Sequence, residues 1–293
     1  MKKLTALLMG TAMVLSLAAC GGSASSAASS EAVSRDAASS EETSEAASSE
    51  ETSEAAAEET TDEAAGEVTT VNAGKLTMST NAAFPPYEMT TDSGDLEGID
   101  IEVAGAIAEK LGLELQVDDM DFDAALLATQ SGKSDMVMAG VTVTDERQKV
   151  MDFSDTYAEG IQSIIVPEDS DIASADDLAG KIIGTQRGTT GYIYCTDDFG
   201  EDSVVAYDDG LTAVQALNNG QVDAVVIDNA PAKEFVAANP GLKILDTAYA
   251  QEDYAIGVAK GNTELLNAIN GALEELQADG TLQSIVDKYI KAE

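Results

Sequence analysis

The segment Met136-Val-Met-Ala-Gly-Val-Thr-Val-Thr-Asp-Glu-Arg147 decides the fold. Its first half is a continuous apolar run, which predicts a buried strand over 135–139. Its second half is polar, and Thr144 or Asp145 can cap a short helical turn over 145–150 that carries Arg147. Ligands of α/β proteins gather where strands end, so the polar turn is a candidate binding segment. A helix cap alone also explains Thr144-Asp-Glu, and the two roles are compatible.

The same alternation of short apolar runs and helical periods extends through the chain and indicates an α/β protein. Strands are expected over 76–80, 113–117, 135–139 and 160–166, then over 181–185, 203–207, 222–227 and 254–259. Helices are expected over 99–111, 122–130, 211–217, 230–238, 264–277 and 282–290, with another opening at 188–191. The pattern repeats, so we predict two lobes, 73–160 plus 254–293 and 161–253. Two crossings, near 158–162 and 247–253, would join them.

Arg147 and Arg187 are the only arginines beyond residue 70. A guanidinium is suited to a planar carboxylate, which it holds through two parallel hydrogen bonds. We interpret Arg147 as the carboxylate-binding residue of a small ligand. Gly140 would let that ligand approach the backbone, and Thr142 offers a hydroxyl beside it. The alternative is an arginine in a structural ion pair, and this alternative is favoured for Arg187.

The segment Gly188-Thr-Thr-Gly191 follows a predicted strand and opens a predicted helix. A helix start exposes backbone N–H groups and the positive end of the helix dipole, which suits an anion. No Gly-x-x-x-x-Gly-Lys motif is present, so the segment is not a nucleotide loop. A plain turn is the alternative.

Asp228 ends the apolar run Val222-Asp-Ala-Val-Val-Ile227. A carboxylate there can accept hydrogen bonds from an ammonium group, although it can also simply cap the helix over 229–238. Combined with a carboxylate site at Arg147, it would recognise a zwitterion. Phe84 and Tyr87 flank two stiffening prolines, and one ring can form an apolar wall over the ligand. The alternative places both rings in the core.

The N-terminus has the features of an export signal: Lys2-Lys3, an apolar run over 4–17, and Leu-Ala-Ala-Cys20. The cysteine position resembles a bacterial lipoprotein signal, which implies cleavage after residue 19 and lipidation of Cys20. An ordinary secretory signal with a chance cysteine is the alternative. Residues 20–72 are mainly Ser, Ala, Thr and Glu, so we expect a disordered acidic tether.

Composition excludes several classes of function. The net charge of −39 argues against nucleic-acid binding. With Cys20 lipidated, Cys195 is the only remaining cysteine, which leaves no intrachain disulfide. The chain has no histidine, so His-based triads and most zinc sites are excluded. No cofactor or metal is expected.

Six motifs occur in an order that resembles one family. They are Asn81-Ala-Ala-Phe-Pro-Pro-Tyr-Glu88, Glu97-Gly-Ile-Asp-Ile-Glu102, Ala139-Gly-Val-Thr-Val-Thr-Asp-Glu-Arg147, Met151-Asp-Phe-Ser-Asp155, Gly188-Thr-Thr-Gly191 and Ile227-Asp-Asn-Ala-Pro231. Over residues 75–290 the chain resembles the polar amino-acid-binding lipoproteins of ABC importers, which have the type II periplasmic binding protein fold. The resemblance implies two α/β lobes with a hinged cleft between them.

The resemblance also implies ligand-binding roles for particular residues. Arg147 would grip the α-carboxylate with help from Gly140, Thr142 and the Thr190 amide. Asp228 would take the α-amino group, and Phe84 would cover the ligand. The residues that would read the ligand side chain are Asn81, Gln186 and Gly191, with Arg187 a further candidate. Relatives for strongly basic amino acids often have an acid near the first turn, so Asn81 favours a polar, neutral ligand.

The expected protein is thus a monomeric bacterial receptor, anchored by lipid on Cys20 at the extracytoplasmic face of the cell membrane. It would capture a free amino acid and deliver it to an ABC permease. One alternative is an enzyme on the same scaffold that dehydrates cyclohexadienyl acids, which would need a carboxyl group as general acid. A sensor or adhesin module is the other.

Overall fold

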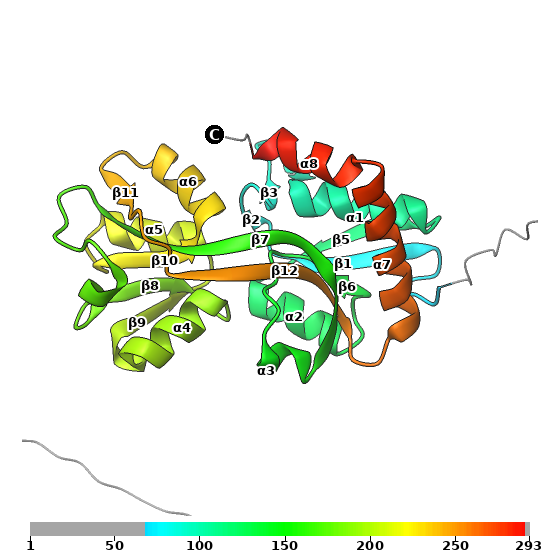
Figure 1. Cartoon of the computed structure of the whole chain (residues 1–293), viewed down its shortest axis with the longest axis horizontal. Coiled ribbons are helices and arrows are strands. Elements are labelled where there is room, and N and C mark those ends of the chain that lie inside the picture. The colour runs from blue at the N-terminus through cyan, green and yellow to red at the C-terminus, as the bar shows by residue number, and fades with distance from the viewer. Residues whose placement is uncertain (1–67, 291–293) are drawn as a thin grey trace, which may run out of the picture. The chain divides into compact units, whose positions relative to one another are not determined.

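A mixed sheet of nine strands runs through residues 68–290, the part of the chain that the computed structural model describes (Figure 1). The strand order is β5-β1-β6-β12-β7-β10-β8-β9, and β11 pairs with β7. The strands are β1 (Lys75–Thr80), β5 (Glu114–Asp119), β6 (Met136–Val137), β7 (Met151–Pro167), β8 (Ile183–Gln186), β9 (Val204–Tyr207), β10 (Ala224–Asp228), β11 (Leu242–Ile244) and β12 (Ala250–Ala259).

The first lobe is built on β1, which pairs in parallel with both β5 and β6. Its helices are α1 (Ile99–Lys110), α2 (Phe122–Gln130), α3 (Asp145–Gln148), α7 (Thr263–Ala278) and α8 (Thr281–Tyr289). Helix α1 buries Ile99, Val103 and Ile107 completely, as the helical spacing of these residues predicts. The helix ends before Gly112, whose φ of 67° suits a residue without a side chain.

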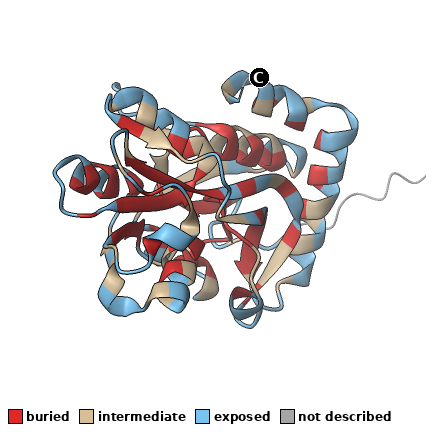
Figure 2. Ribbon diagram, turned by 60° about the vertical axis from the view of Figure 1, so that its left-hand side comes forward, coloured by how far each residue is buried: buried red, intermediate tan, exposed pale blue. Residues whose placement is uncertain are grey.

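The second lobe repeats this plan with β8 at its centre, parallel to both β9 and β10. Its helices are α4 (Thr190–Phe199), α5 (Gly210–Asn218) and α6 (Asn229–Ala238), with short 3-10 turns at Ala175–Leu178 and Glu201–Ser203. The strands of both lobes are mostly buried beneath their helices (Figure 2). The predicted α/β class and the repeated pattern are therefore confirmed.

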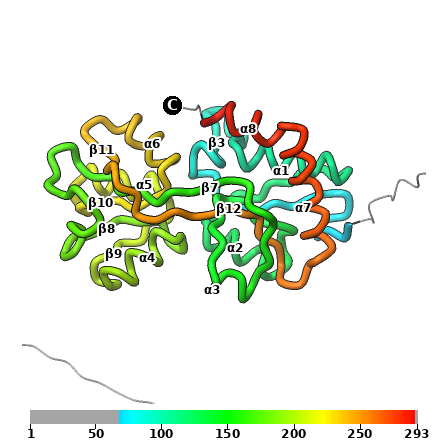
Figure 3. Tube along the Cα trace, in the orientation of Figure 1, coloured from blue at the N-terminus to red at the C-terminus, as the bar shows by residue number. Residues whose placement is uncertain are grey.

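Strands β7 and β12 carry the chain between the lobes and run side by side (Figure 3). They pair antiparallel from Ala250 opposite Gln162 to Ala259 opposite Met151. Both strands are longer than predicted: β12 begins at Ala250 rather than at Tyr254, and β7 begins at Met151 rather than at Gly160. Its first half, Met151-Asp-Phe-Ser-Asp-Thr-Tyr-Ala-Glu159, contains three acids and therefore lacks an apolar run. The two lobes form one compact unit, and their exact boundaries stay a prediction.

A second, small sheet was not predicted. Strands β2 (Ala83–Phe84), β3 (Glu88–Thr90) and β4 (Leu96–Glu97) pair antiparallel around the two prolines of the first turn. Strands of two or three residues are too short to show a period. The sheet positions Phe84 and Tyr87, whose rings stack with centroids 5.8 Å apart. Tyr87 in turn meets the ring of Tyr254 edge-on at 5.4 Å.

The predicted signal segment, the predicted lipidation site Cys20 and nearly all of the predicted tether lie outside the described residues. No helix within residues 68–290 has the length and apolar character that crossing a membrane requires.

Two buried acids, Glu88 and Asp100, face each other in the first lobe. Asp100 Oδ2 accepts hydrogen bonds from the Gly140 N–H at 2.9 Å and the Tyr157 hydroxyl at 2.8 Å. Within residues 68–290, its Oδ1 and both Glu88 oxygens are buried without a hydrogen-bond partner. Burial without compensating hydrogen bonds favours the protonated form of a carboxyl group. Burial raises the pKa of Asp100 to about 6 and that of Glu88 well above its usual range.

We expect this acid pair to make folding stability fall as pH rises. Because the folded pKa values exceed the unfolded ones, the folded protein binds more protons than the unfolded chain above about pH 4. The stabilisation is complete below that pH and is lost as pH rises through the folded values. Glu88→Gln should reduce the loss between pH 5 and pH 8 by about 1 kcal/mol or more, measured by urea unfolding. Glu109→Gln, an exposed acid on α1, should retain the wild-type slope; equal slopes in all three proteins would contradict the assignment.

Gly160 lies where β7 passes beneath Tyr254, and a Cβ there would lie 2.5 Å from Cζ of that ring. Gly160→Ala should therefore lower the free energy of unfolding by about 1–3 kcal/mol through overpacking. Gly271 on α7 has no neighbour within 4 Å of an added Cβ, so Gly271→Ala should raise stability by about 0.5–1 kcal/mol. Chemical denaturation of both variants tests the pair. A Gly160→Ala variant as stable as the wild type would show that the packing at Tyr254 is misassigned.

Candidate functional site

Arg147 lies on the short helix α3, where Thr144 caps the helix by accepting a hydrogen bond from the Arg147 N–H at 3.2 Å. The predicted cap is confirmed. The arginine is only 8 % exposed. Its guanidinium donates to the Thr142 carbonyl at 2.8 Å and, across the cleft, to the Gly188 carbonyl at 3.1 Å. Its Cζ lies 5.4 Å from the ring centroid of Phe122. The guanidinium is therefore fixed in position and shared between the two lobes.

No carboxylate among residues 68–290 forms an ion pair with Arg147. Burial lowers the pKa of the guanidinium, and the negative charge of Glu252 partly offsets this effect. A buried guanidinium that lacks an ion-pair partner is costly. The Arg147 guanidinium has five N–H donors, and its two contacts with carbonyl groups leave other donors available. The arrangement therefore suits an anion supplied from outside the protein.

The N-terminus of α4 faces Arg147 from the second lobe. Thr189 caps this helix, and its hydroxyl accepts a hydrogen bond from the Tyr192 N–H at 3.3 Å. Within the described part of the chain, the N–H groups of Thr190 and Gly191 have no hydrogen-bond acceptor. Open donors at the positive end of a ten-residue helix favour an anion.

A cavity of about 30 Å³ lies between the lobes at this point. Seven of the predicted ligand-binding residues line it: Asn81, Phe84, Gly140, Thr142, Arg147, Gln186 and Thr190. The lining also includes Glu88, Phe122, Ala139, Gln162, Thr189, Val226, Ile227 and Tyr254. The fold thus brings together residues from Asn81 to Tyr254, which are far apart in sequence. Their roles toward a ligand stay predictions.

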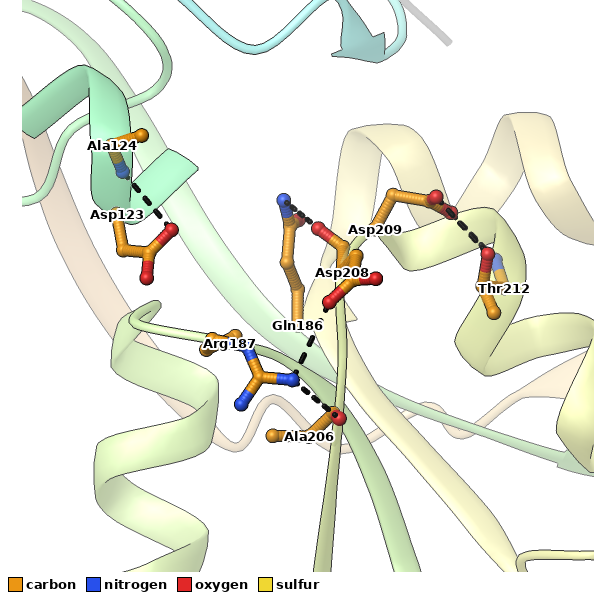
Figure 4. Close-up of polar contacts among 8 residues, drawn as sticks. All are labelled: Asp123, Ala124, Gln186, Arg187, Ala206, Asp208, Asp209 and Thr212. Carbon is orange, nitrogen blue, oxygen red and sulfur yellow. Dashed lines mark hydrogen bonds and ion pairs between the residues drawn. The ribbon is translucent and has the colours of Figure 1, made fainter. Parts of the chain in front are cut away.

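Asn81 and Gln186, the two predicted readers of a ligand side chain, bond directly to each other. The Gln186 amide donates to Asn81 Oδ1 at 2.8 Å, and this bond bridges the lobes. Gln186 also donates to the Asp208 carbonyl at 3.4 Å, as Figure 4 shows. Both side chains are buried. A ligand side chain that reaches Asn81 and Gln186 must form hydrogen bonds with them in place of the bond that they form with each other.

The other two predicted residues, Gly191 and Asp228, do not line the cavity. Asp228 caps α6 through the Ala230 N–H at 3.0 Å, and its second oxygen accepts the Ile161 N–H at 2.7 Å. The cap that sequence offered as an alternative role is therefore present. Burial raises the pKa of Asp228, while these bonds and one from Tyr254 oppose the rise. Gly191 packs against Gln162, whose Oε1 would lie 2.9 Å from an added Cβ.

Arg187 differs from Arg147 in exposure and in having an acidic partner. It is exposed, and its guanidinium donates to the Asp208 carboxylate and the Ala206 carbonyl, both at 3.4 Å (Figure 4). The ion pair favoured for Arg187 is therefore present.

Sequence reasoning missed Phe122, Gln162 and Glu252 as site residues. Phe122 opens α2 in an ordinary apolar pattern, so nothing distinguished its ring from a core residue. Gln162 and Glu252 lie on β7 and β12, within or beside the predicted crossings. A buried acid between exposed Gln251 and Asp253 has no signal in an alternating acidic segment. Among residues 68–290 no group of acidic or cysteine side chains could hold a metal ion.

Comparisons with known proteins agree with this geometry. A family model described as bacterial extracellular solute-binding proteins, family 3, matches residues 76–292. The L-cystine-binding protein TcyJ of Escherichia coli strain K12 is 34% identical over 223 residues, which cover 75% of this chain and 84% of that protein.

Two solved structures of an ancestral arginine-binding protein are also similar. The form bound to glutamine has a TM-score of 0.72 at 44% identity and covers 75% of this chain and 99% of that chain. The form bound to arginine has a TM-score of 0.70 at 46% identity, with 74% and 98% covered. These likenesses confirm the predicted two-lobed type II periplasmic binding protein fold. The chain belongs to family 3 of the bacterial extracellular solute-binding proteins.

Proposed function

We propose that the cleft captures a free amino acid, whose α-carboxylate binds the Arg147 guanidinium. The buried guanidinium without an ion-pair partner among residues 68–290 carries this proposal. The open N–H groups of Thr190 and Gly191 face the same point from the other lobe. The relatives are described as binding cystine, arginine or glutamine, all of which share this carboxylate.

The α-ammonium group is assigned to Asp228. Each of its oxygens already accepts one backbone N–H, and a carboxylate oxygen has a second lone pair for a further donor. Asp228 follows Ile227, which lines the cavity. Phe84 and Phe122 supply apolar walls. The Asn81–Gln186 pair offers both donors and acceptors, so it favours a polar, neutral side chain.

Binding is coupled to closure of the lobes. Arg147 and Gln186 both bond across the cleft, so a ligand bound between them stabilises the closed arrangement and shifts the population toward it. The closed protein then delivers the amino acid to an ABC permease. This step is supported by a relative from Bacillus subtilis strain 168, which is described as the ABC transporter glutamine-binding protein GlnH. The family consists of solute-binding proteins rather than enzymes, so the dehydratase alternative is not supported.

The N-terminus extends this proposal. A lipid on Cys20 anchors the protein to the membrane surface, and the acidic segment over 20–72 acts as a tether that keeps a monomeric receptor near its permease.

Arg147→Met should weaken amino-acid binding by more than about a hundredfold, because the ligand carboxylate would be buried without its charge partner. Arg187→Met is the matched control, since it removes the same charge from an exposed position. A thermal-shift screen of the twenty amino acids, cystine and ornithine identifies the ligand, and calorimetric titration then measures both variants. Near-wild-type affinity in Arg147→Met, or an equal loss in Arg187→Met, would contradict the proposal.

The anchor is tested separately in a bacterial host that processes lipoproteins. The wild-type protein should incorporate labelled palmitate and sediment with membranes, whereas Cys20→Ser should do neither. Cys195→Ser should behave as wild type, because its thiol is buried within α4. Labelling that persists in Cys20→Ser would exclude Cys20 as the lipidation site.

A further inference from the structure

Glu88 is a buried acid that lines the cavity between the lobes. It lies on β3 and is 1% exposed, and neither of its carboxyl oxygens has a hydrogen-bond partner among residues 68–290. A carboxylate in such a place is costly, so burial favours the protonated form of the side chain. The proposed capture of an amino acid assigns Glu88 no role.

The neighbouring acid, Asp100 of α1, is better compensated. Its Oδ2 accepts hydrogen bonds from the Gly140 N–H at 2.9 Å and from the Tyr157 hydroxyl at 2.8 Å. Such bonds favour the ionised form of a carboxyl group. Because the two acids repel each other when both are ionised, they titrate as a coupled pair, and Glu88, which lacks donors, keeps the proton. Gly140 lines the cavity as well, so the acid pair reaches the cavity wall at two points.

The other titratable groups around Glu88 leave the proton on this residue. Burial, and then the negative charges of Asp100 and Asp119, raise the pKa of Glu88 well above its usual range. Burial also raises the pKa values of three nearby tyrosines, which stay neutral: Tyr87, Tyr157 and Tyr254. Arg147 lines the same cavity, but its guanidinium donates to two backbone carbonyls.

Closure of the lobes removes water from this wall of the cavity without adding a compensating charge. Among residues 68–290, the second lobe contributes uncharged side chains to the lining: Gln186, Thr189, Thr190, Val226 and Ile227. When the lobes separate, water takes the place of these side chains and can solvate an ionised Glu88. The pKa of Glu88 is therefore higher in the closed form than in the open form.

We propose that capture of the amino acid is coupled to uptake of a proton by Glu88, so that affinity falls as pH rises. This inference rests on the proposed capture of an amino acid and adds a response to pH. A group whose pKa is raised on closure strengthens binding fully below its open-form pKa and loses that effect as pH rises through its closed-form pKa. A difference of one pKa unit between the two forms corresponds to an about tenfold change in affinity.

Calorimetric titration of the wild type and of Glu88→Gln tests the coupling. The probe is L-glutamine, replaced by the neutral amino acid with the largest thermal shift if glutamine does not bind. Glu88→Gln keeps the size of the side chain and mimics its protonated form. The ratio of wild-type affinity to Glu88→Gln affinity should fall about tenfold between about pH 5.5 and pH 8. This ratio removes the ionisation of the ligand and of Asp228, which both proteins share.

Glu109→Gln is the control, because it removes an acid from an exposed position of α1. Its affinity relative to the wild type should stay constant within about twofold over the same range. Proton uptake is also measured on the wild type alone, by titration at about pH 7 in two buffers that differ in ionisation enthalpy. Net uptake of a fraction of a proton is expected, so the inference stays testable even if Glu88→Gln folds poorly.

A ratio that falls with pH, together with net proton uptake by the wild type, supports the inference. A constant ratio, or no uptake, overturns it while leaving the proposed function intact. A protein that captures only amino acids with cationic side chains also overturns it, because such a side chain would favour ionised Glu88. A wild type that binds no amino acid overturns the proposed function and this inference with it.

Discussion

The buried guanidinium of Arg147 is the constraint on which the site depends. It is held by carbonyls of Thr142 and Gly188, one from each lobe, yet no carboxylate within residues 68–290 forms an ion pair with it. A structural arginine in this position would be expected to have a partner acid, as Arg187 has in Asp208. An unpaired buried charge costs free energy, and proteins commonly accept such costs at functional sites. In the proposed function, the ligand carboxylate offsets this cost when it binds.

The two strands that connect the lobes, β7 and β12, also carry buried polar side chains. Strands β7 and β12 pair along the length of β12, from Ala250 to Ala259, so they couple the lobes mechanically. Gln162 and Glu252 lie on this ribbon, and Glu252 accepts hydrogen bonds from the Thr142 hydroxyl and the Gln162 amide. The same ribbon presents Tyr254 above Gly160, where only a residue without a side chain fits. The proposed closure of the lobes would therefore involve the same two strands that carry these buried polar side chains.

Sequence reasoning was most successful where one element shows one clear pattern. The spacing of Ile99, Val103 and Ile107 predicted α1 almost to its ends, and the Thr144 cap followed from local chemistry. It failed for β2 to β4, which are too short to show a period, and for the acidic first half of β7. Glu252 could not be identified because its burial is created by the pairing of two distant strands. The positions of Asn81 and Gln186 were predicted, but their bond to each other was not.

The most direct measurement is a crystal structure of the protein with its amino acid bound. The account predicts the ligand carboxylate within hydrogen-bond distance of the Arg147 guanidinium and of an N–H group at the start of α4. Its ammonium group should lie against acceptors rather than donors. A ligand carboxylate bound elsewhere, with Arg147 still contacting only the Thr142 and Gly188 carbonyls, would contradict the central claim.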